Sequence, residues 1–359
     1  MKRINILIIY LIIKTISIST ILSQKMIVCV PVTDLRAHPS SAPSQAYGLV
    51  LYPNNPEQRS QLLLNEKVIA LQQKDDWTQV KAIEQPKSDE THEKICEYQT
   101  GWVPSSHLTH VNEFPKFNIV IKEQWAMVIK TVKNTISLNT IYLSIGTKLE
   151  VIKKIYENFE NLYHIKLPNN EKGIIEEKNV KELNLHPQEE EKFRQEIITT
   201  AGTFINTPYS WGGRSGYDNT APYQTGVDCS GFINLVYRVN GMDIPRNAHD
   251  QYLACRQIES FNLKKGDFIF FGKNQTINMK KSLKINHIMM CWNSKYIIES
   301  SGEAPTYKNR IISAEERFGK PLHQLKNGDL IGNQTIYFGT LINNFSHTKT
   351  NTTSKSTHI

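Results

Sequence analysis

Two neighbouring stretches decide the fold of the C-terminal half of the chain: Thr207-Pro208-Tyr209-Ser210-Trp211-Gly212-Gly213-Arg214 and Val227-Asp228-Cys229-Ser230-Gly231-Phe232. The first is a glycine-containing loop, and the second leads into an apolar segment that predicts a helix over residues 229–239. A cysteine at a helix start meets free backbone N–H groups and the positive end of the helix dipole, which both favour the thiolate. Cys229 is therefore the candidate nucleophile, and the alternative is a buried structural cysteine.

A candidate base follows in Asn286-His287-Ile288-Met289-Met290, where a histidine heads an apolar strand. A turn at residues 293–295 would pair that strand with the next one and bring Glu299 beside the imidazole. Nucleophile, base and orienting group would then all be present. The alternatives are a core histidine satisfied by backbone groups and a solvated carboxylate at a strand end.

The ordered set of blocks over about residues 189–342 resembles the NlpC-type cell-wall cysteine peptidases. The resemblance implies a papain-like α+β fold and cleavage of the D-γ-glutamyl bond to a diamino acid in peptidoglycan stem peptides. The blocks that carry it are Pro208 to Gly213, Asp228-Cys229-Ser230-Gly231, Ile244-Pro245-Arg246, Lys265-Gly266-Asp267-Phe268-Ile269-Phe270-Phe271 and the strand from His287.

The resemblance also implies roles for single residues. Cys229 looks like the nucleophile, His287 like the general base and acid, and Tyr209 like an oxyanion donor beside the Cys229 N–H. The implied substrate contacts are Asp228, Ser230, Arg246 and Trp211, with aromatic packing as the alternative for Tyr209 and Trp211. The family usually carries a histidine where this chain has Glu299, but a carboxylate can also accept from the imidazole and stabilise imidazolium.

Upstream, short apolar runs broken by turn signals predict two small all-β barrels, over residues 26–112 and 116–185, with a helical turn near residues 56–63. They resemble bacterial SH3-like domains, chiefly at Asn65-Glu66-Lys67-Val68 and Gly101-Trp102-Val103-Pro104. Such barrels before a peptidase are similar to secreted γ-D-glutamyl-L-diamino-acid endopeptidases. That likeness implies that Glu66 and Tyr98 hold the free amine of an N-terminal L-alanine on released muropeptides. The alternative is that both are ordinary surface residues.

The termini and the domain limits follow from composition. Lys2-Arg3 and the apolar run after it predict an export signal over residues 1–23, hence a periplasmic or extracellular protein; the alternative is an uncleaved anchor. Residues 187–342 are predicted to form the peptidase domain, opened by a helix that starts at Pro187. The Thr/Ser/Asn-rich residues 346–359 are predicted to be a disordered tail.

The net charge of +8 is scattered, which argues against a nucleic-acid partner and leaves peptidoglycan-derived peptides as the expected one. No stable membrane insertion is expected once the signal is cleaved, and no motif indicates a metal or cofactor.

Of the five cysteines, Cys29 and Cys96 are candidates for a bridge, whereas Cys255 and Cys291 are interpreted as small buried hydrophobes. His249 and Asp250 are interpreted as helix-cap and packing residues. Two alternatives stay open for the whole chain: a non-catalytic wall-binding protein, and a papain-like amidase or acyltransferase acting on another substrate.

Overall fold

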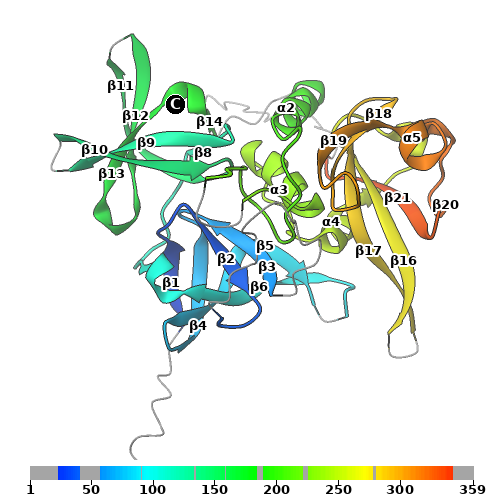
Figure 1. Cartoon of the computed structure of the whole chain (residues 1–359), viewed down its shortest axis with the longest axis horizontal. Helices are drawn as coiled ribbons and strands as arrows, with labels where there is room; N and C mark the ends of the chain where they lie inside the picture. Colours follow the sequence, from blue (N-terminus) through cyan, green and yellow to red (C-terminus); the bar gives the residue numbers. More distant parts are fainter. Residues whose placement is uncertain are drawn as a thin grey trace, which may run out of the picture.

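The computed structural model describes residues 23–40, 57–89, 91–132, 135–157, 159–183, 189–220, 225–277 and 280–342. The predicted export signal, apart from Ser23, and the predicted tail lie outside these residues. Strands dominate the described chain, and the few α-helices gather in its C-terminal part (Figure 1). Each of the three β-rich parts is built on its own antiparallel sheet.

The first module is a seven-stranded sheet in the order β3-β2-β6-β5-β4-β1-β7. Alternation along β5 turns Thr78, Val80 and Ala82 inward, as a half-buried strand requires. The strands and the one short 3-10 helix are β1 (Gln24–Val28), β2 (Val32–Arg36), β3 (Gln58–Leu63), β4 (Lys67–Lys74), β5 (Trp77–Ser88), β6 (Ile95–Pro104), η1 (Ser105–His107) and β7 (Leu108–His110).

Two sequence predictions for this module need correction. The sheet has free ends at β3 and β7, so within the described residues it is open and not a closed barrel. The helical turn predicted near residues 56–63 is wrong, because Gln58–Leu63 is the edge strand β3. Pairing with β2 buries Ser60, Gln61, Leu62 and Leu63 together, a tertiary contact that overrides the local turn signal.

The second module repeats this plan in the order β10-β9-β13-β12-β11-β8-β14, again open at both ends. The all-β character predicted for residues 116–185 is present, but the closed barrel is not formed within the described residues. The elements are β8 (Ile119–Ile121), β9 (Trp125–Val132), β10 (Thr135–Ser144), β11 (Lys148–Glu157), β12 (Glu160–Lys166), η2 (Pro168–Asn170), β13 (Lys172–Glu176), η3 (Glu177–Asn179) and β14 (Val180–Glu182).

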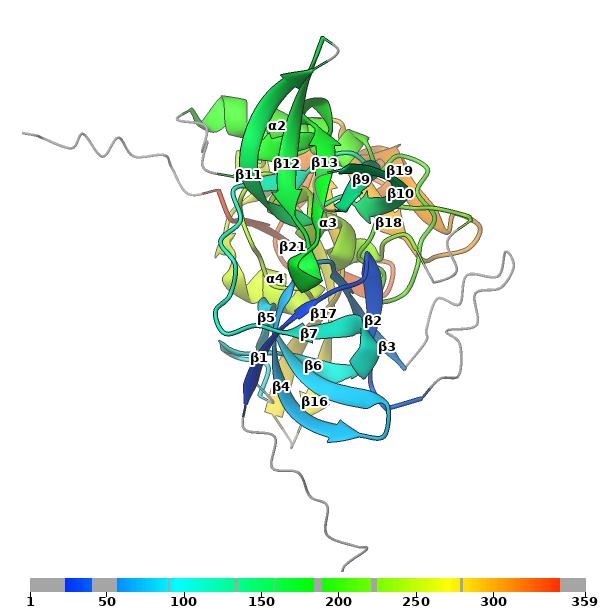
Figure 2. The ribbon, with the colours of Figure 1, turned by 90° about the vertical axis from the view of Figure 1, so that its left-hand side faces the viewer.

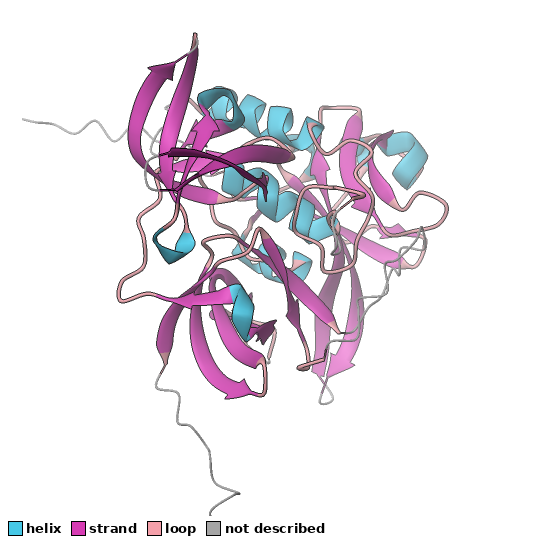
Figure 3. Ribbon diagram, turned by 60° about the vertical axis from the view of Figure 1, so that its left-hand side comes forward, coloured by secondary structure: helices cyan, strands magenta, loops and turns pink. Residues whose placement is uncertain are grey.

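The C-terminal part packs helices against an antiparallel sheet of order β15-β21-β16-β17-β18-β19, with β20 beside β21 (Figure 3). The predicted helix over residues 229–239 is confirmed to the residue. The helices are α2 (Glu190–Gly202), α3 (Cys229–Val239), α4 (Ala248–Ala254), η4 (Ser260–Asn262), α5 (Ala314–Phe318) and η5 (Leu322–Gln324). The strands are β15 (Arg256–Gln257), β16 (Phe268–Ile277), β17 (Lys280–Cys291), β18 (Tyr296–Ser301), β19 (Lys308–Ser313), β20 (Leu330–Ile331) and β21 (Gln334–Thr340).

Helix α3 lies where the three parts meet, and every one of its residues is buried (Figure 2). One core joins Leu63 of the first module, Ile145 of the second and Leu235 of α3. Gly146 adopts φ +84°, and a Cβ there would lie 2.7 Å from the Leu235 side chain, so only glycine allows this approach. The two upstream modules therefore pack directly on the helix that begins with the candidate nucleophile.

The cysteines do not form the predicted bridge. All five fall within the described residues and all are free thiols. Cys29 instead donates to the Ser106 carbonyl, and Cys96 is exposed. Cys291 is fully buried and Cys255 partly buried, and burial raises the pKa of Cys291 to about 12, so both fit the interpretation as packing residues. Among the described helices, none is long and apolar enough to cross a membrane.

Candidate active site

Cys229 is the first residue of α3, directly after a capping aspartate. The Asp228 carboxylate accepts from the Gly231 backbone N–H at 2.6 Å, which satisfies one of the unpaired N–H groups of the first turn. A side chain at position 231 would lie 2.1 Å from the Gly213 carbonyl, so glycine lets the loop pack against the helix start. The thiol thus sits at the positive end of the helix dipole, as the sequence predicted.

His287 reaches the thiol from β17, although it lies well inside that strand and not at its start. Phe271 of β16 pairs with His287, but the next residue, Gly272, pairs with Ile285, so Asn286 is an extra residue in the ladder. A β-bulge of this kind re-aims neighbouring side chains and is frequent beside active sites. It is the local feature that sets the direction of the imidazole.

A relay of polar contacts runs from Cys229 through His287 to Glu299. The Cys229 side chain is near enough to His287 to raise the pKa of the imidazole, and His287 Nε2 lies 2.9 Å from Glu299 Oε2. Burial by itself would lower the pKa of His287, but the hydrogen bonds to Cys229 and Glu299 outweigh it and raise the pKa to about 10. The ring is therefore imidazolium at neutral pH, ready to stabilise a thiolate.

Glu299 is fully buried and is held by two arginines as well as by the histidine. Arg310 Nη2 donates to its Oε1 at 2.8 Å, and Arg317 Nε lies 3.3 Å away. Burial would raise the pKa of Glu299, but the bond to His287 and the positive charges of Arg317 and Arg310 hold it at about 2. The alternative of a solvated strand-end carboxylate does not fit these surroundings. The sequence analysis missed both arginines; the signal available was that Arg310 pairs with position 299 on the next strand.

Tyr209 lies beside the Cys229–Asp228 pair. Burial, together with the nearby Cys229 and Asp228 side chains, raises the pKa of its phenol far above the ordinary value, so the hydroxyl stays protonated and can only be used as a neutral donor. Its backbone is fixed by a bridge to Val227 and by donation to the Tyr307 carbonyl. This placement suits the predicted oxyanion donor. Trp211, in the same loop, is 37% exposed, so its indole is accessible at the surface.

Three of the predicted substrate contacts, Asp228, Ser230 and Arg246, are joined to one another by hydrogen bonds. Arg246 donates two parallel hydrogen bonds to the Asp228 carboxylate, from Nη1 to Oδ1 at 3.0 Å and from Nη2 to Oδ2 at 2.8 Å. Arg246 Nη1 also donates to Ser230 Oγ at 3.0 Å, and its Nε donates to Ser60 of the first module. Because Arg246 is 1% exposed and both Asp228 oxygens have several donors, these side chains position the helix start instead of facing an open site.

Glu66 also departs from its prediction. Its carboxylate is 1% exposed and forms an ion pair with Arg214, which follows the Gly212-Gly213 loop. Gln85 donates to its second oxygen at 3.2 Å. A carboxylate buried in this way has no free face for a substrate amine, so Glu66 joins the first module to the loop. Tyr98 on β6 is 38% exposed and remains a predicted substrate contact.

The first module thus supplies residues that the sequence analysis did not identify. Gln61 Oε1 accepts from the Arg214 backbone N–H at 2.9 Å and from Ser215 Oγ at 3.0 Å. With Ser60 on Arg246, these contacts fix the loop before Cys229 from outside the C-terminal part. No local motif marks a glutamine or serine for such a role, since the partners lie more than 150 positions away.

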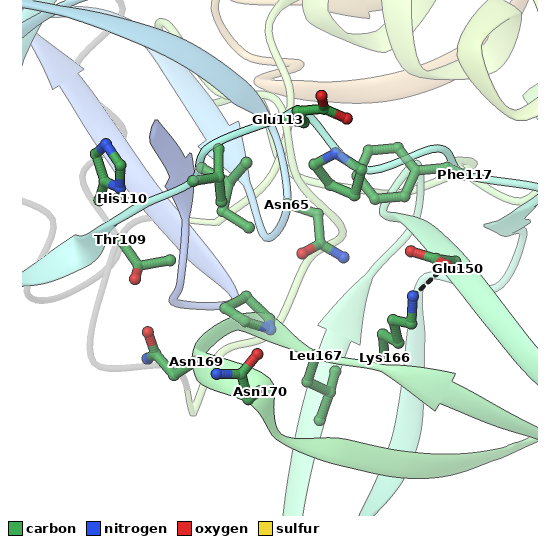
Figure 4. A pocket seen from close by; sticks show the side chains of 14 residues that line it. Asn65, Thr109, His110, Glu113, Phe117, Glu150, Lys166, Leu167, Asn169 and Asn170 are labelled. Carbon is green, nitrogen blue, oxygen red and sulfur yellow. Dashed lines mark hydrogen bonds and ion pairs between the residues drawn. The ribbon is translucent and has the colours of Figure 1, made fainter. Parts of the chain in front are cut away.

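A separate cavity of about 340 Å³ lies between the two upstream modules (Figure 4). The amides of Asn65, Asn169 and Asn170 and the ring of Phe117 line it, and the ion pair of Lys166 with Glu150 closes one side. None of its lining residues is among those placed around Cys229.

Glu299→Gln should lower activity much less than His287→Ala, and it should move the alkaline limb of the kcat/KM profile. The carboxylate helps hold the pKa of His287 near 10, so activity that needs imidazolium is present below that pH and is lost as pH rises through it. Without the charge, and with Arg310 and Arg317 still nearby, that limb should shift to lower pH by about one to three units. The measurement is kcat/KM from pH 5 to pH 11.

Glu303→Gln is the matched control, because Glu303 also pairs with Arg317, at 3.4 Å, but is largely exposed. Its profile should equal that of the wild type. An unshifted alkaline limb in Glu299→Gln would contradict the relay. Glu299→His, which restores the usual residue of the resembling family, should not preserve activity here, because it sets an imidazole against two arginines.

Residues 206–316 match the NlpC/P60 family model. A gamma-D-glutamyl-L-lysine dipeptidyl-peptidase of Bacillus cereus is 28% identical over 221 residues, 60% of this chain and 60% of that protein. The protein of the same name from Bacillus subtilis is 28% identical over 216 residues, 60% of this chain and 64% of that one. The chain therefore spans about three fifths of the length of these curated relatives.

A crystal structure of an NlpC/P60 family protein from Bacillus cereus is similar to the whole arrangement. The TM-score is 0.64 at 23% identity, over 80% of this chain and 94% of that chain. The likeness extends beyond the C-terminal part, since 80% of the chain includes more than residues 206–316. It shows the fold.

Proposed function

We propose that the chain is a cysteine endopeptidase acting on peptidoglycan stem peptides, on the premise that residues 206–316 match the NlpC/P60 family model. The bond cut is the one between D-γ-glutamate and the diamino acid. The observation that supports this proposal most directly is the placement of Cys229 at the start of a buried helix, next to His287, whose Nε2 contacts Glu299. The names of the Bacillus relatives support the substrate class.

In the first half of the reaction the Cys229 thiolate attacks the γ-carbonyl carbon of the D-glutamyl residue, and a C–S bond forms. Negative charge collects on the carbonyl oxygen, and the Cys229 backbone N–H and the Tyr209 hydroxyl are its proposed donors. The C–N bond then breaks as His287 gives its proton to the leaving amine of the diamino acid. Glu299 keeps the imidazole oriented and stabilises its charged form.

In the second half His287 is neutral and removes one proton from a water molecule, whose oxygen attacks the thioester carbonyl. The C–S bond breaks and expels the Cys229 thiolate, the γ-carboxyl group of D-glutamate gives its proton to solvent as it leaves, and the imidazolium and thiolate pair is restored. The same two donors serve the second tetrahedral intermediate. The geometry needs no further group for this cycle.

The assignment of the upstream parts belongs to the same proposal. Residues 26–112 and 116–185 are proposed as SH3-like domains, residues 187–342 as the peptidase domain, residues 1–23 as an export signal and residues 346–359 as a tail. The protein would act outside the cytoplasm, on wall peptides. Contacts of Ser60, Gln61 and Glu66 with the loop before Cys229 support a first module that forms part of the catalytic unit.

The substrate is proposed to be a released peptide with a free amino terminus. The name dipeptidyl-peptidase, which both Bacillus relatives carry, supports a cut two residues from a free end of the substrate. L-Ala-γ-D-Glu-L-Lys should be hydrolysed to L-Ala-D-Glu and lysine, detected by mass spectrometry. Acetylating the alanine amine should lower kcat/KM at least about tenfold, which corresponds to about 1.4 kcal/mol.

Tyr98→Phe tests the remaining candidate for that end of the peptide. Losing one hydrogen bond should lower kcat/KM on the free peptide by a few-fold, on the order of 1 kcal/mol, and change the acetylated peptide less. Tyr142→Phe, an exposed tyrosine of the second module, is the matched control. Equal hydrolysis of free and acetylated peptides would shift the substrate to intact wall. Absence of any cleavage across a panel of muropeptides would overturn the peptidase proposal.

A further inference from the structure

The first turn of α4 contacts two elements that are far apart in sequence. Helix α4 packs against β17, which carries His287, and against the β5–β6 hairpin of the first module (Figure 1). The sequence analysis interpreted His249 and Asp250, in this turn, as cap and packing residues. Asn247 makes no side-chain cap, but its Nδ2 donates to Asp250 Oδ2 at 3.1 Å, and His249 and Asp250 also have partners on β17 and on the β5–β6 hairpin.

His249 spans the gap between the two elements through its two ring nitrogens. Nδ1 lies 3.2 Å from the backbone N–H of Ile285, and Nε2 lies 3.0 Å from the His92 carbonyl. A backbone N–H can only donate and a carbonyl can only accept, so the ring must be neutral, with its proton on Nε2. The two contacts together fit the tautomer of His249 that carries its proton on Nε2.

The Ile285 end of this bridge is next to the bulge that aims the candidate base. Ile285 pairs with Gly272, Asn286 is the extra residue, and His287 follows. A bulge leaves the ladder locally disrupted, so its geometry depends on contacts from outside the sheet. The acceptor on His249 provides such a contact two residues before His287.

The other end of the bridge lies on the hairpin that carries Tyr98. Asp250 Oδ1 accepts from the backbone N–H of Ser88, the last residue of β5, at 2.9 Å, and this bond is buried. His92, whose carbonyl receives the His249 proton, lies in the connection between β5 and β6. His249 and Asp250 together thus fasten the hairpin of the first module to the strand of His287.

We propose that His249 is a positioning residue that holds the bulge at Asn286, and with it the direction of the His287 imidazole, while Asp250 docks the β5–β6 hairpin. This inference rests on the proposed peptidase function. The two adjacent residues have different roles in this proposal. His249 affects the rate of the chemical step, whereas Asp250 affects the binding of substrate through the hairpin that carries Tyr98.

Three substitutions of His249 distinguish the contribution of the Nδ1 contact from that of the Nε2 contact. Asparagine places an acceptor near the Nδ1 position, so His249→Asn can keep the bond from Ile285. Glutamine places a donor near the Nε2 position, so His249→Gln can keep the bond to His92 but leaves Ile285 unpaired. His249→Ala loses both. We expect kcat of the Ala and Gln variants to fall about 10- to 100-fold, the scale of small misplacements, and that of the Asn variant to stay within about threefold.

Asp250→Ala is the companion variant for the hairpin. It should raise KM for L-Ala-γ-D-Glu-L-Lys several-fold with kcat nearly unchanged, whereas Asp250→Asn keeps an acceptor for Ser88 and should behave as the wild type. Melting temperatures of all variants are compared, so that kcat is taken from folded protein. Equal kcat values for His249→Asn and His249→Gln would overturn the proposal, as would a loss of kcat in Asp250→Ala as large as in His249→Ala.

A second readout keeps this inference apart from the proposed substrate. The rate at which iodoacetamide alkylates Cys229 reports the thiolate and imidazolium pair without any peptide. It should fall in His249→Gln and His249→Ala and be retained in His249→Asn. If the wild type alkylates rapidly but cleaves no muropeptide, the substrate proposal fails and the positioning role is still tested. An alkylation rate unaffected by all three variants would remove the role of His249.

Discussion

Cys229→Ala is expected to abolish peptide hydrolysis, with a loss of about 10⁴-fold or more, the scale for removing a triad nucleophile. The reason is that the thiolate forms the bond to the carbonyl carbon, and no other described thiol can replace it. Cys291 is buried with a pKa raised to about 12, and Cys255 is also shifted upward by burial. The melting temperature should change little, because alanine is well tolerated at a helix start next to an intact Asp228 cap.

The measurement is release of lysine from L-Ala-γ-D-Glu-L-Lys by purified protein, with circular dichroism to confirm folding. Cys96→Ala is the matched control, since Cys96 is exposed and free, and it should keep full activity. Iodoacetamide should inactivate both the wild type and Cys96→Ala. Hydrolysis by Cys229→Ala above about one percent of wild type, far milder than the loss of a nucleophile, would refute the mechanism.

Arg246→Ala is expected to have the second largest effect, on stability and activity together. The guanidinium lies at 1% exposure between Asp228, Ser230 and Ser60, so its removal leaves the Asp228 carboxylate buried without its ion partner. Breaking a buried pair in this way costs about 3–5 kcal/mol. For a domain of 150 to 250 residues this lowers the melting temperature by about 10 °C. Activity should also fall, since Asp228 caps the helix that presents Cys229.

Arg194→Ala separates the two effects, because Arg194 makes a comparably buried pair with Asp267, at 2.8 Å, without contact to Asp228. It should lose similar stability but retain the kcat of the folded protein. Arg246→Lys, which keeps the charge but not the two parallel bonds, should fold and still show reduced kcat. If Arg246→Lys kept full kcat, or if Arg194→Ala lost as much kcat as Arg246→Lys, the helix-start role of Arg246 would fail.

Much of the site was predictable because its signals are local. An apolar run after a glycine-containing loop is enough to predict the helix over residues 229–239, and with it the position of Cys229 at the helix dipole. Two strands joined by a short turn place residues near the turn side by side, which is why Glu299 could be predicted beside His287. These relations depend on backbone periodicity, so the amino-acid sequence carries them without knowledge of the rest of the fold.

The partners of the buried charges were not predictable in the same way. Glu66 looked available for a substrate amine, but it pairs with Arg214, 148 positions away, and Asp228 and Ser230 pair with Arg246 in place of substrate. The edge strand at residues 58–63, which contains Ser60 and Gln61, was predicted as a helical turn. Each of these polar side chains has surroundings formed by elements from different parts of the chain.

The sequence by itself determined the kind of chemistry: a thiol at a helix start, a histidine on a strand and a carboxylate on the next strand. The tertiary structure decided which polar groups are buried against one another around the site. The physical reason is that a charge removed from water must find partners among the groups enclosed with it. At Arg246 those groups are Ser60, Asp228 and Ser230, and only the packing of the first module on α3 encloses them together.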